Sequence, residues 1–109
     1  MGSKMPVLPD APTLADFQQY VLELEKERGF SDQTLLEKCL LLGEEVGELF
    51  RAVRRTEGLP TAASSPAAEA AEELADVLIY LCTIANRLGI DLEEAFRHKE
   101  RANAGRSWS

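Results

Sequence analysis

Histidine, cysteine and aromatic residues are scarce in this chain, and each scarcity excludes a class of site. Its 109 residues include one histidine, two cysteines and one tryptophan. Cys39 and Cys82 have no Cys-x-x-Cys or Cys/His spacing, which argues against structural zinc. We interpret both cysteines as small buried hydrophobic residues. A di-iron bundle needs two Glu-x-x-His motifs, whereas the single histidine, His98, has an alanine at position 95.

Positive charge is also limited. The 12 basic residues are outnumbered by 19 acidic ones, for a net charge of −7. General nucleic-acid binding needs a basic surface, so we expect none. No apolar run approaches the ~20 residues of a membrane span. The N-terminus lacks the apolar segment of a signal peptide. We therefore expect a cytoplasmic protein that binds neither nucleic acid nor membrane.

The first half of the chain carries two segments with helical periodicity. Thr13 is a candidate N-cap for a helix that runs to about Arg28. Ser31 or Asp32 is expected to cap a second helix, which ends at the basic pair Arg54-Arg55, ahead of Gly58. Residues 1–12, with three prolines, are expected to form a flexible arm, and the stretch ahead of a second methionine is a candidate tag remnant.

The second half carries two further helical segments. Ser65 followed by Pro66 predicts a helix start, and Gly89 predicts its end. Asp91 caps a fourth helix that extends to about Ala104. No alternating strand pattern occurs, so residues 13–109 are expected to form one all-α domain, an antiparallel four-helix bundle-like fold. Residues 77–82 are apolar on all sides of their helix, which favours a homodimer or homotetramer.

Carboxylates interrupt the two longest helices beside their apolar stripes. Glu44, Glu45 and Glu48 lie within about 100° on one helix, and Glu73 and Asp76 lie within about 60° on the next. Such acids are costly to bury unless they are paired or bind a cation. Facing each other across a groove, they would suit Mg²⁺, with Mn²⁺ as a substitute. Periodicity alone leaves the alternative of ordinary surface glutamates open.

These motifs resemble a known family. Glu44-Glu45-x-x-Glu48 followed by Glu73-x-x-Asp76 is similar to the acidic signature of the MazG-like, all-α nucleoside triphosphate pyrophosphohydrolases. The tail resembles the K-x-x-x-N-x-x-R-x-W ending of that family, with Lys99, Asn103, Arg106 and Trp108 at the matching positions. The resemblance covers about residues 31–108.

The resemblance implies Mg²⁺-dependent hydrolysis of a nucleoside triphosphate to its monophosphate and pyrophosphate. The metal ligands it implies are Glu45, Glu48, Glu73 and Asp76. Glu44 would complete a second metal site or orient the attacking water, which places Glu44 and Glu45 at the catalytic position. Two alternatives are a phosphoribosyl-ATP pyrophosphohydrolase and an inactive helical oligomerisation module.

Substrate contacts are expected from basic residues and from the tail. Lys99, Asn103 and Arg106 share a helical face, which by itself favours a solvated basic surface. The resemblance implies instead that they contact phosphate or sugar. Lys38 shares the face of Glu45, so it is either a phosphate contact or an ion-pair partner of the acids. Trp108 would close over the nucleotide or pack on a neighbouring subunit. For the other aromatic residues, such as Phe50 and Tyr80, core packing is expected.

Overall fold

The computed structural model describes residues 6–29, 32–57 and 66–106. These residues form four helices: α1 (Leu14–Arg28), α2 (Leu35–Thr56), α3 (Pro66–Leu88) and α4 (Leu92–Ala104). No strand occurs in these ranges, and the all-α prediction is confirmed. Within the same ranges, no helix is both long and apolar enough to span a lipid bilayer.

The ends of α1 follow local rules. Thr13 Oγ1 accepts a hydrogen bond from the Asp16 N–H at 3.2 Å, and Asp16 Oδ2 accepts one from the Thr13 N–H at 2.8 Å. This reciprocal pair satisfies two N–H groups that a helix start would otherwise leave unpaired. Gly29 ends the helix at φ 73°, a left-handed conformation that favours glycine.

The start of α2 differs from the expected one. The N-cap is Thr34, and the predicted caps Ser31 and Asp32 are wrong. Thr34 Oγ1 accepts from the Glu37 N–H at 3.1 Å, while Glu37 Oε1 accepts from the Thr34 N–H at 2.9 Å. Only Thr34 has a glutamate three residues later that completes this reciprocal pair. The bonds with Thr34 hold the pKa of Glu37 below its usual value.

The junction between α3 and α4 is a compact turn. The Ile90 N–H donates to the Ala85 carbonyl at 2.8 Å, and the Gly89 N–H donates to the Asn86 carbonyl at 3.2 Å. This pattern terminates α3 as predicted, with Gly89 at φ 68°. Asp91 Oδ1 then accepts from the Glu94 N–H at 2.9 Å and begins α4.

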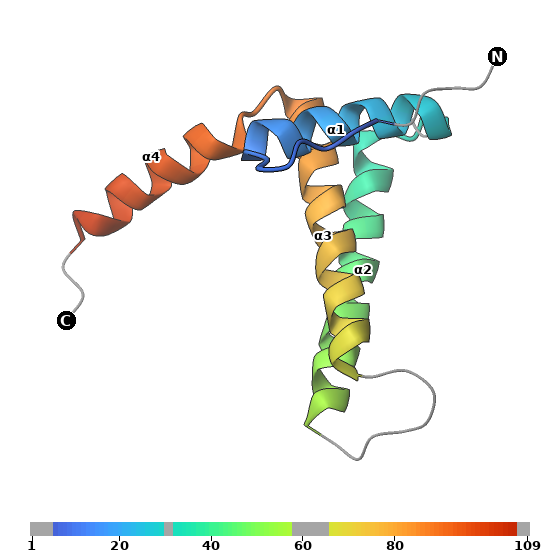
Figure 1. The fold of residues 1–109 in the computed structure, drawn as a ribbon. Coiled ribbons are helices and arrows are strands. Elements are labelled where there is room, and N and C mark those ends of the chain that lie inside the picture. Colours follow the sequence, from blue (N-terminus) through green and yellow to red (C-terminus); the bar gives the residue numbers. More distant parts are fainter. Residues whose placement is uncertain (1–5, 30–31, 58–65, 107–109) are drawn as a thin grey trace.

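The helices are arranged around one hairpin. Helices α2 and α3 lie side by side and antiparallel, α1 crosses one end of this hairpin, and α4 leads away from it (Figure 1). Within one chain, the expected bundle is therefore represented by the α2–α3 hairpin, with α1 laid across its end. This hairpin places the middle of α2 against the middle of α3.

A buried glutamine fixes α1 to the turn between α3 and α4. Gln18 Nε2 donates to the Ile90 carbonyl at 2.8 Å and to Asn86 Oδ1 at 3.1 Å. Gln18 Oε1 accepts from the Leu92 N–H at 2.8 Å, and Asn86 Nδ2 donates to the Gln18 carbonyl at 2.9 Å. The network provides hydrogen-bond partners both for the Gln18 side chain and for the backbone groups of the turn.

The apolar core of the described chain is small. Its buried apolar side chains are Val21, Leu24, Ala52, Cys82 and Ala85. Cys82 is fully buried as predicted, but Cys39 is exposed, which contradicts its expected place in the core. Phe50 is 67% exposed, so core packing is wrong for this aromatic within one chain. The buried positions of α2 are Lys38 and Ala52.

Candidate metal centre

Three carboxylates from two helices converge in the α2–α3 hairpin. Glu73 and Asp76 lie about one turn apart on α3. Glu45 lies opposite them on α2. One oxygen from each of the three side chains lies within 4.8 Å of the others. The antiparallel pairing of two helices thus turns two short acidic motifs into one cluster, which we call the carboxylate triad.

Protonation of Glu45 reflects this crowding. Its pKa is raised from the ordinary value of 4.5 to about 7, first because its carboxyl group shares a hydrogen bond with Glu73. Partial burial also raises the pKa, and so do the negative charges of Glu73, Asp76 and Glu48. Like charges in close contact disfavour the ionised form. Each of these effects raises the pKa of Glu45, and among the described residues none lowers it.

Glu73 provides a further sign that the triad suits a cation. Its Oε2 atom is buried and has no hydrogen-bond partner among the described residues. A buried carboxylate oxygen without a partner is costly. Carboxylate oxygens are the preferred ligands of hard divalent cations such as Mg²⁺. The donor set and the unpaired oxygen therefore fit a divalent metal ion.

The two remaining acids of the motif flank the triad. Glu48 contributes to the raised pKa of Glu45, and its Oε1 lies 3.7 Å from Arg51 Nη1. Glu44 is exposed on α2. The pKa of the half-buried Tyr80 is raised, first by burial and then by the charges of Glu45, Asp76 and Glu44. Glu44 thus lies on the Tyr80 side of the cluster, and Glu48 lies on the Arg51 side.

Lys38 occupies a buried position two turns before Glu45. Its side chain is 3% exposed, its Nζ lies 3.8 Å from Glu25 Oε2, and it sits 5.9 Å from the centre of the Tyr80 ring. Glu25 Oε2 also pairs with Arg87 Nη2 at 3.2 Å. Of the two expected roles, the structure shows an ion pair, and the partner is Glu25 of α1. Sequence reasoning missed Glu25, which gave no periodic signal.

The expected phosphate contacts of the tail do not meet the triad within one chain. Lys99 and Asn103 lie on α4, which leads away from the hairpin (Figure 1). Asn103 Nδ2 donates to Glu100 Oε1 at 3.3 Å. Gly105 caps α4, and the exposed Arg106 follows it. Trp108 lies outside the described residues.

The structure brings two other cations to the groove. Beyond the triad, a pocket of about 260 Å³ is lined by Glu48 and Glu73 and by Arg51 and Arg55. Arg55 Nη1 lies 2.8 Å from Glu69 Oε2. Sequence reasoning treated Arg55 only as a helix-terminal charge and did not single out Arg51. Their spacing of three and seven residues from Glu48 places them on the same side of the helix, and this signal was available.

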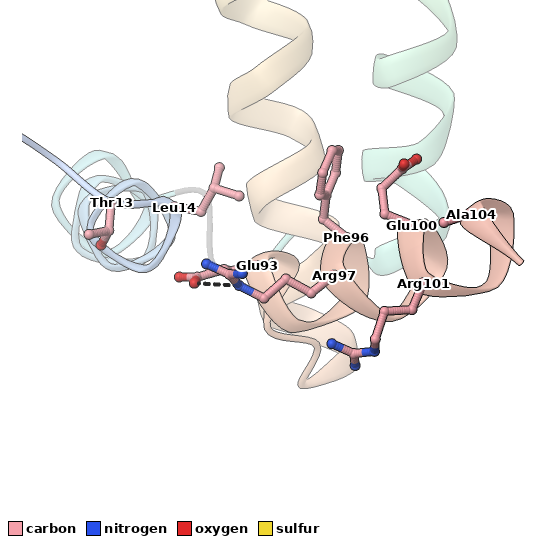
Figure 2. A pocket seen from close by; sticks show the side chains of 8 residues that line it. All are labelled: Thr13, Leu14, Glu93, Phe96, Arg97, Glu100, Arg101 and Ala104. Carbon is pink, nitrogen blue, oxygen red and sulfur yellow. Dashed lines mark hydrogen bonds and ion pairs between the residues drawn. The ribbon is translucent and has the colours of Figure 1, made fainter.

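A larger hollow of about 680 Å³ lies elsewhere, between the start of α1 and α4 (Figure 2). Phe96 points into the open space, and the Arg97–Glu93 ion pair of 3.0 Å lies beside it. Phe96 is 65% exposed, and α4 contributes no buried residue. Opposite charges of α4 neutralise each other here, and the carboxylate triad is not part of the lining. We regard it as a contact surface rather than as the site of chemistry.

Comparison with known proteins identifies the family. A family model described as "MazG nucleotide pyrophosphohydrolase domain" matches residues 31–102. The chain belongs to this MazG family. The MazG chain is 29% identical over 96 residues to the "Uncharacterized protein YvdC" of Bacillus subtilis (strain 168). The aligned region covers 81% of this chain and 91% of YvdC.

The extent of the MazG match bears on the candidate residues. Residues 31–102 include the carboxylate triad, Glu44, Glu48, Lys38 and Lys99. Asn103, Arg106 and Trp108 lie beyond the matched range. The family resemblance drawn from the acidic motifs is confirmed, whereas the roles of all the individual site residues remain predictions.

Proposed function

We propose that this protein is a Mg²⁺-dependent nucleotide pyrophosphohydrolase that converts a nucleoside triphosphate to its monophosphate and pyrophosphate. The observation that carries the proposal is the convergence of Glu45, Glu73 and Asp76, with a buried Glu73 oxygen that lacks a partner. Membership of the MazG family supports the reaction class. The preferred substrate is a non-canonical or surplus nucleotide, so the role is to clean the nucleotide pool of the cytoplasm.

The triad, with Glu48 at its edge, would hold the cation. Bound Mg²⁺ would neutralise triphosphate charge and lower the pKa of a coordinated water. Glu44, exposed next to Glu45 on α2, would orient the attacking water and accept its proton. Water oxygen then bonds to the α-phosphorus, the bridging bond to the β-phosphate breaks, and pyrophosphate leaves. Mn²⁺ would substitute for Mg²⁺ because it accepts the same oxygen ligands.

Self-association is part of the same proposal. Within residues 6–29, 32–57 and 66–106, only five apolar residues are buried, which is a small core. Helix α3 leaves Leu74, Leu81 and Leu88 between 43% and 56% exposed, at a spacing of seven residues. This spacing aligns the leucines along one side of the helix. A second copy that covers this stripe would complete the core, and its α4 could bring Lys99 and Asn103 towards a neighbouring triad.

A turnover assay tests the proposed reaction. The protein is incubated with canonical and modified nucleoside triphosphates, with and without Mg²⁺, and the phosphate products are separated. We expect monophosphate and pyrophosphate only when Mg²⁺ is present. Release of orthophosphate would place the cleaved bond elsewhere. Absence of turnover with every nucleotide at high enzyme concentration would favour the inactive oligomerisation module, and turnover of phosphoribosyl-ATP alone would favour the other alternative.

A further inference from the structure

A pocket of about 260 Å³ lies between α2 and α3 next to the carboxylate triad. Glu48 and Glu73 line this pocket, and Glu73 also belongs to the triad. The pocket and the triad therefore adjoin at Glu73. The pocket lies towards the C-terminal end of α2, where Arg51 and Arg55 are located.

The two arginines are held differently. Arg55 pairs with Glu69 through contacts of 2.8 Å and 3.1 Å, which is the geometry of a strong ion pair. Arg51 is 62% exposed and lies 3.7 Å from Glu48, whose side chain is 47% exposed. An exposed pair at this distance contributes little to stability. The Arg51 guanidinium can therefore turn from Glu48 to a phosphate at small cost, and Glu48 is then available to the metal centre.

Charge differs between the two directions along the groove. Towards the N-terminal end of α2, Lys38 is buried against Glu25 and the Tyr80 ring. Towards the C-terminal end, Arg51 reaches solvent beside the pocket. Guanidinium groups form paired hydrogen bonds with phosphate oxygens. The most highly charged part of a nucleoside triphosphate fits the Arg51 end better than the Lys38 end.

From this asymmetry we propose that Arg51 binds the pyrophosphate end of the substrate. The triphosphate then runs along the groove with its terminal phosphates towards the C-terminal end of α2. This inference rests on the proposed function and adds the orientation of the substrate and a residue that contacts the leaving group. Glu69 and Glu72 also line the pocket, so binding of pyrophosphate depends on a divalent cation at the triad.

Calorimetric titration with inorganic pyrophosphate tests the assignment without requiring turnover. The unmodified protein and three variants are titrated in saturating Mg²⁺ and in EDTA. The variants are Arg51→Gln, Arg51→Lys and Arg54→Gln. Arg54→Gln is the matched control because Arg54 lies on the same helix, is exposed and does not line this pocket. Nucleoside monophosphate is titrated in parallel, and circular dichroism checks the fold of each variant.

We expect Arg51→Gln to weaken pyrophosphate binding about tenfold, the scale of one charge-assisted hydrogen bond. Arg51→Lys should bind pyrophosphate more tightly than Arg51→Gln does, because lysine keeps the positive charge. It should bind less tightly than the unmodified protein, because lysine lacks the paired donors of a guanidinium group. Arg54→Gln should bind pyrophosphate as tightly as the unmodified protein does. The affinity for nucleoside monophosphate should be the same in all the variants. EDTA should abolish pyrophosphate binding.

Three results would overturn the assignment: no pyrophosphate binding by the unmodified protein, equal affinity in Arg51→Gln, or a loss confined to monophosphate. If the protein turns over nucleotides and Arg51→Gln binds pyrophosphate with unchanged affinity, the proposed role of Arg51 is wrong and the proposed hydrolase function stands. If Arg51 contributes to pyrophosphate binding but no nucleotide is turned over, the proposed hydrolase function is wrong instead. The two failures are therefore distinguishable.

Discussion

Glu45 and Glu73 lie on different helices of the α2–α3 hairpin, yet their carboxyl oxygens lie within 4.8 Å of each other, close enough for a shared hydrogen bond to raise the pKa of Glu45. Two carboxyl groups can share such a bond only when one of them keeps its proton. The shared bond is the main reason that the pKa of Glu45 rises to about 7. A divalent cation at the triad would compete with the proton that this raised pKa favours.

Replacing Glu73 by Gln should remove metal binding while it preserves the fold. The change deletes a ligand and one negative charge from the triad, so repulsion in the metal-free protein falls. Mg²⁺ at 100 times its Kd should stabilise the unmodified protein by about 2.7 kcal/mol and should not stabilise the variant. Thermal unfolding with and without Mg²⁺ measures both effects. Glu23→Gln, at an exposed position of α1, is the control and should keep the full Mg²⁺ response.

Stability of the metal-free protein should depend on the protonation of Glu45. Its folded-state pKa of about 7 exceeds the ordinary value of 4.5, so the folded state binds more protons between these values. Its contribution to the free energy of unfolding is therefore fully present below pH 4.5. That contribution falls as the pH rises and is lost above about 7.

Denaturant unfolding in EDTA across this pH range, compared with Glu45→Gln, isolates that contribution. The variant should show a smaller decline because it has no titrating group at this position. Mg²⁺ affinity should rise with pH up to about 7, because the metal must displace the proton. Equal slopes in the two proteins would contradict the prediction.

Replacing Glu25 by Ala should destabilise the fold by about 3 kcal/mol, because removing one partner of a buried ion pair leaves charge without its compensation. Glu25 is the carboxylate that both Lys38 and Arg87 contact, and these three residues come from three different helices. Urea unfolding measures the loss. Glu27→Ala, exposed on the same helix, should change stability by less than about 0.5 kcal/mol. A similar effect of the two substitutions would argue against the buried network.

Replacing Gln18 by Ala should cost about 1–3 kcal/mol, since the partly buried N–H of Leu92 and carbonyl of Ile90 lose their partners. The docking of α1 on the α3–α4 turn should loosen. Hydrogen exchange at the Leu92 amide is the direct measurement and should accelerate. Gln19→Ala, at the neighbouring exposed position, should leave the exchange rate unchanged.

Replacing Leu81 by Glu should shift the proposed oligomer towards the monomer. Leu81 is 43% exposed, in the middle of the apolar stripe of α3, so a charge there would be buried without a partner on association. Light scattering at micromolar concentration should give a dimer or tetramer for the unmodified protein and a smaller species for the variant. Gln19→Glu adds the same charge to an exposed position of α1 and should not change the mass. A monomeric unmodified protein would exclude the interface.

Local sequence determined most of the helix boundaries. The Thr13 cap, the start at Pro66 and the stop at Gly89 follow from interactions within a few residues, which sequence reasoning can evaluate. The start of α2 was missed because several capping residues precede it, and only Thr34 has Glu37 at the spacing that completes a reciprocal bond.

The tertiary structure decided which charges meet. Sequence periodicity placed Glu45 on one helix and Glu73 and Asp76 on another, but only the antiparallel pairing of α2 with α3 brings their oxygens within 4.8 Å. The direction of α4 depends on the α3–α4 turn, which is hydrogen-bonded to Gln18. Because α4 leads away from the hairpin, Lys99 is separated from the triad within one chain (Figure 1). Hydrogen bonds within a helix end are short-range and readable from the sequence. Encounters between helices depend on the whole packing arrangement, which no local pattern specifies.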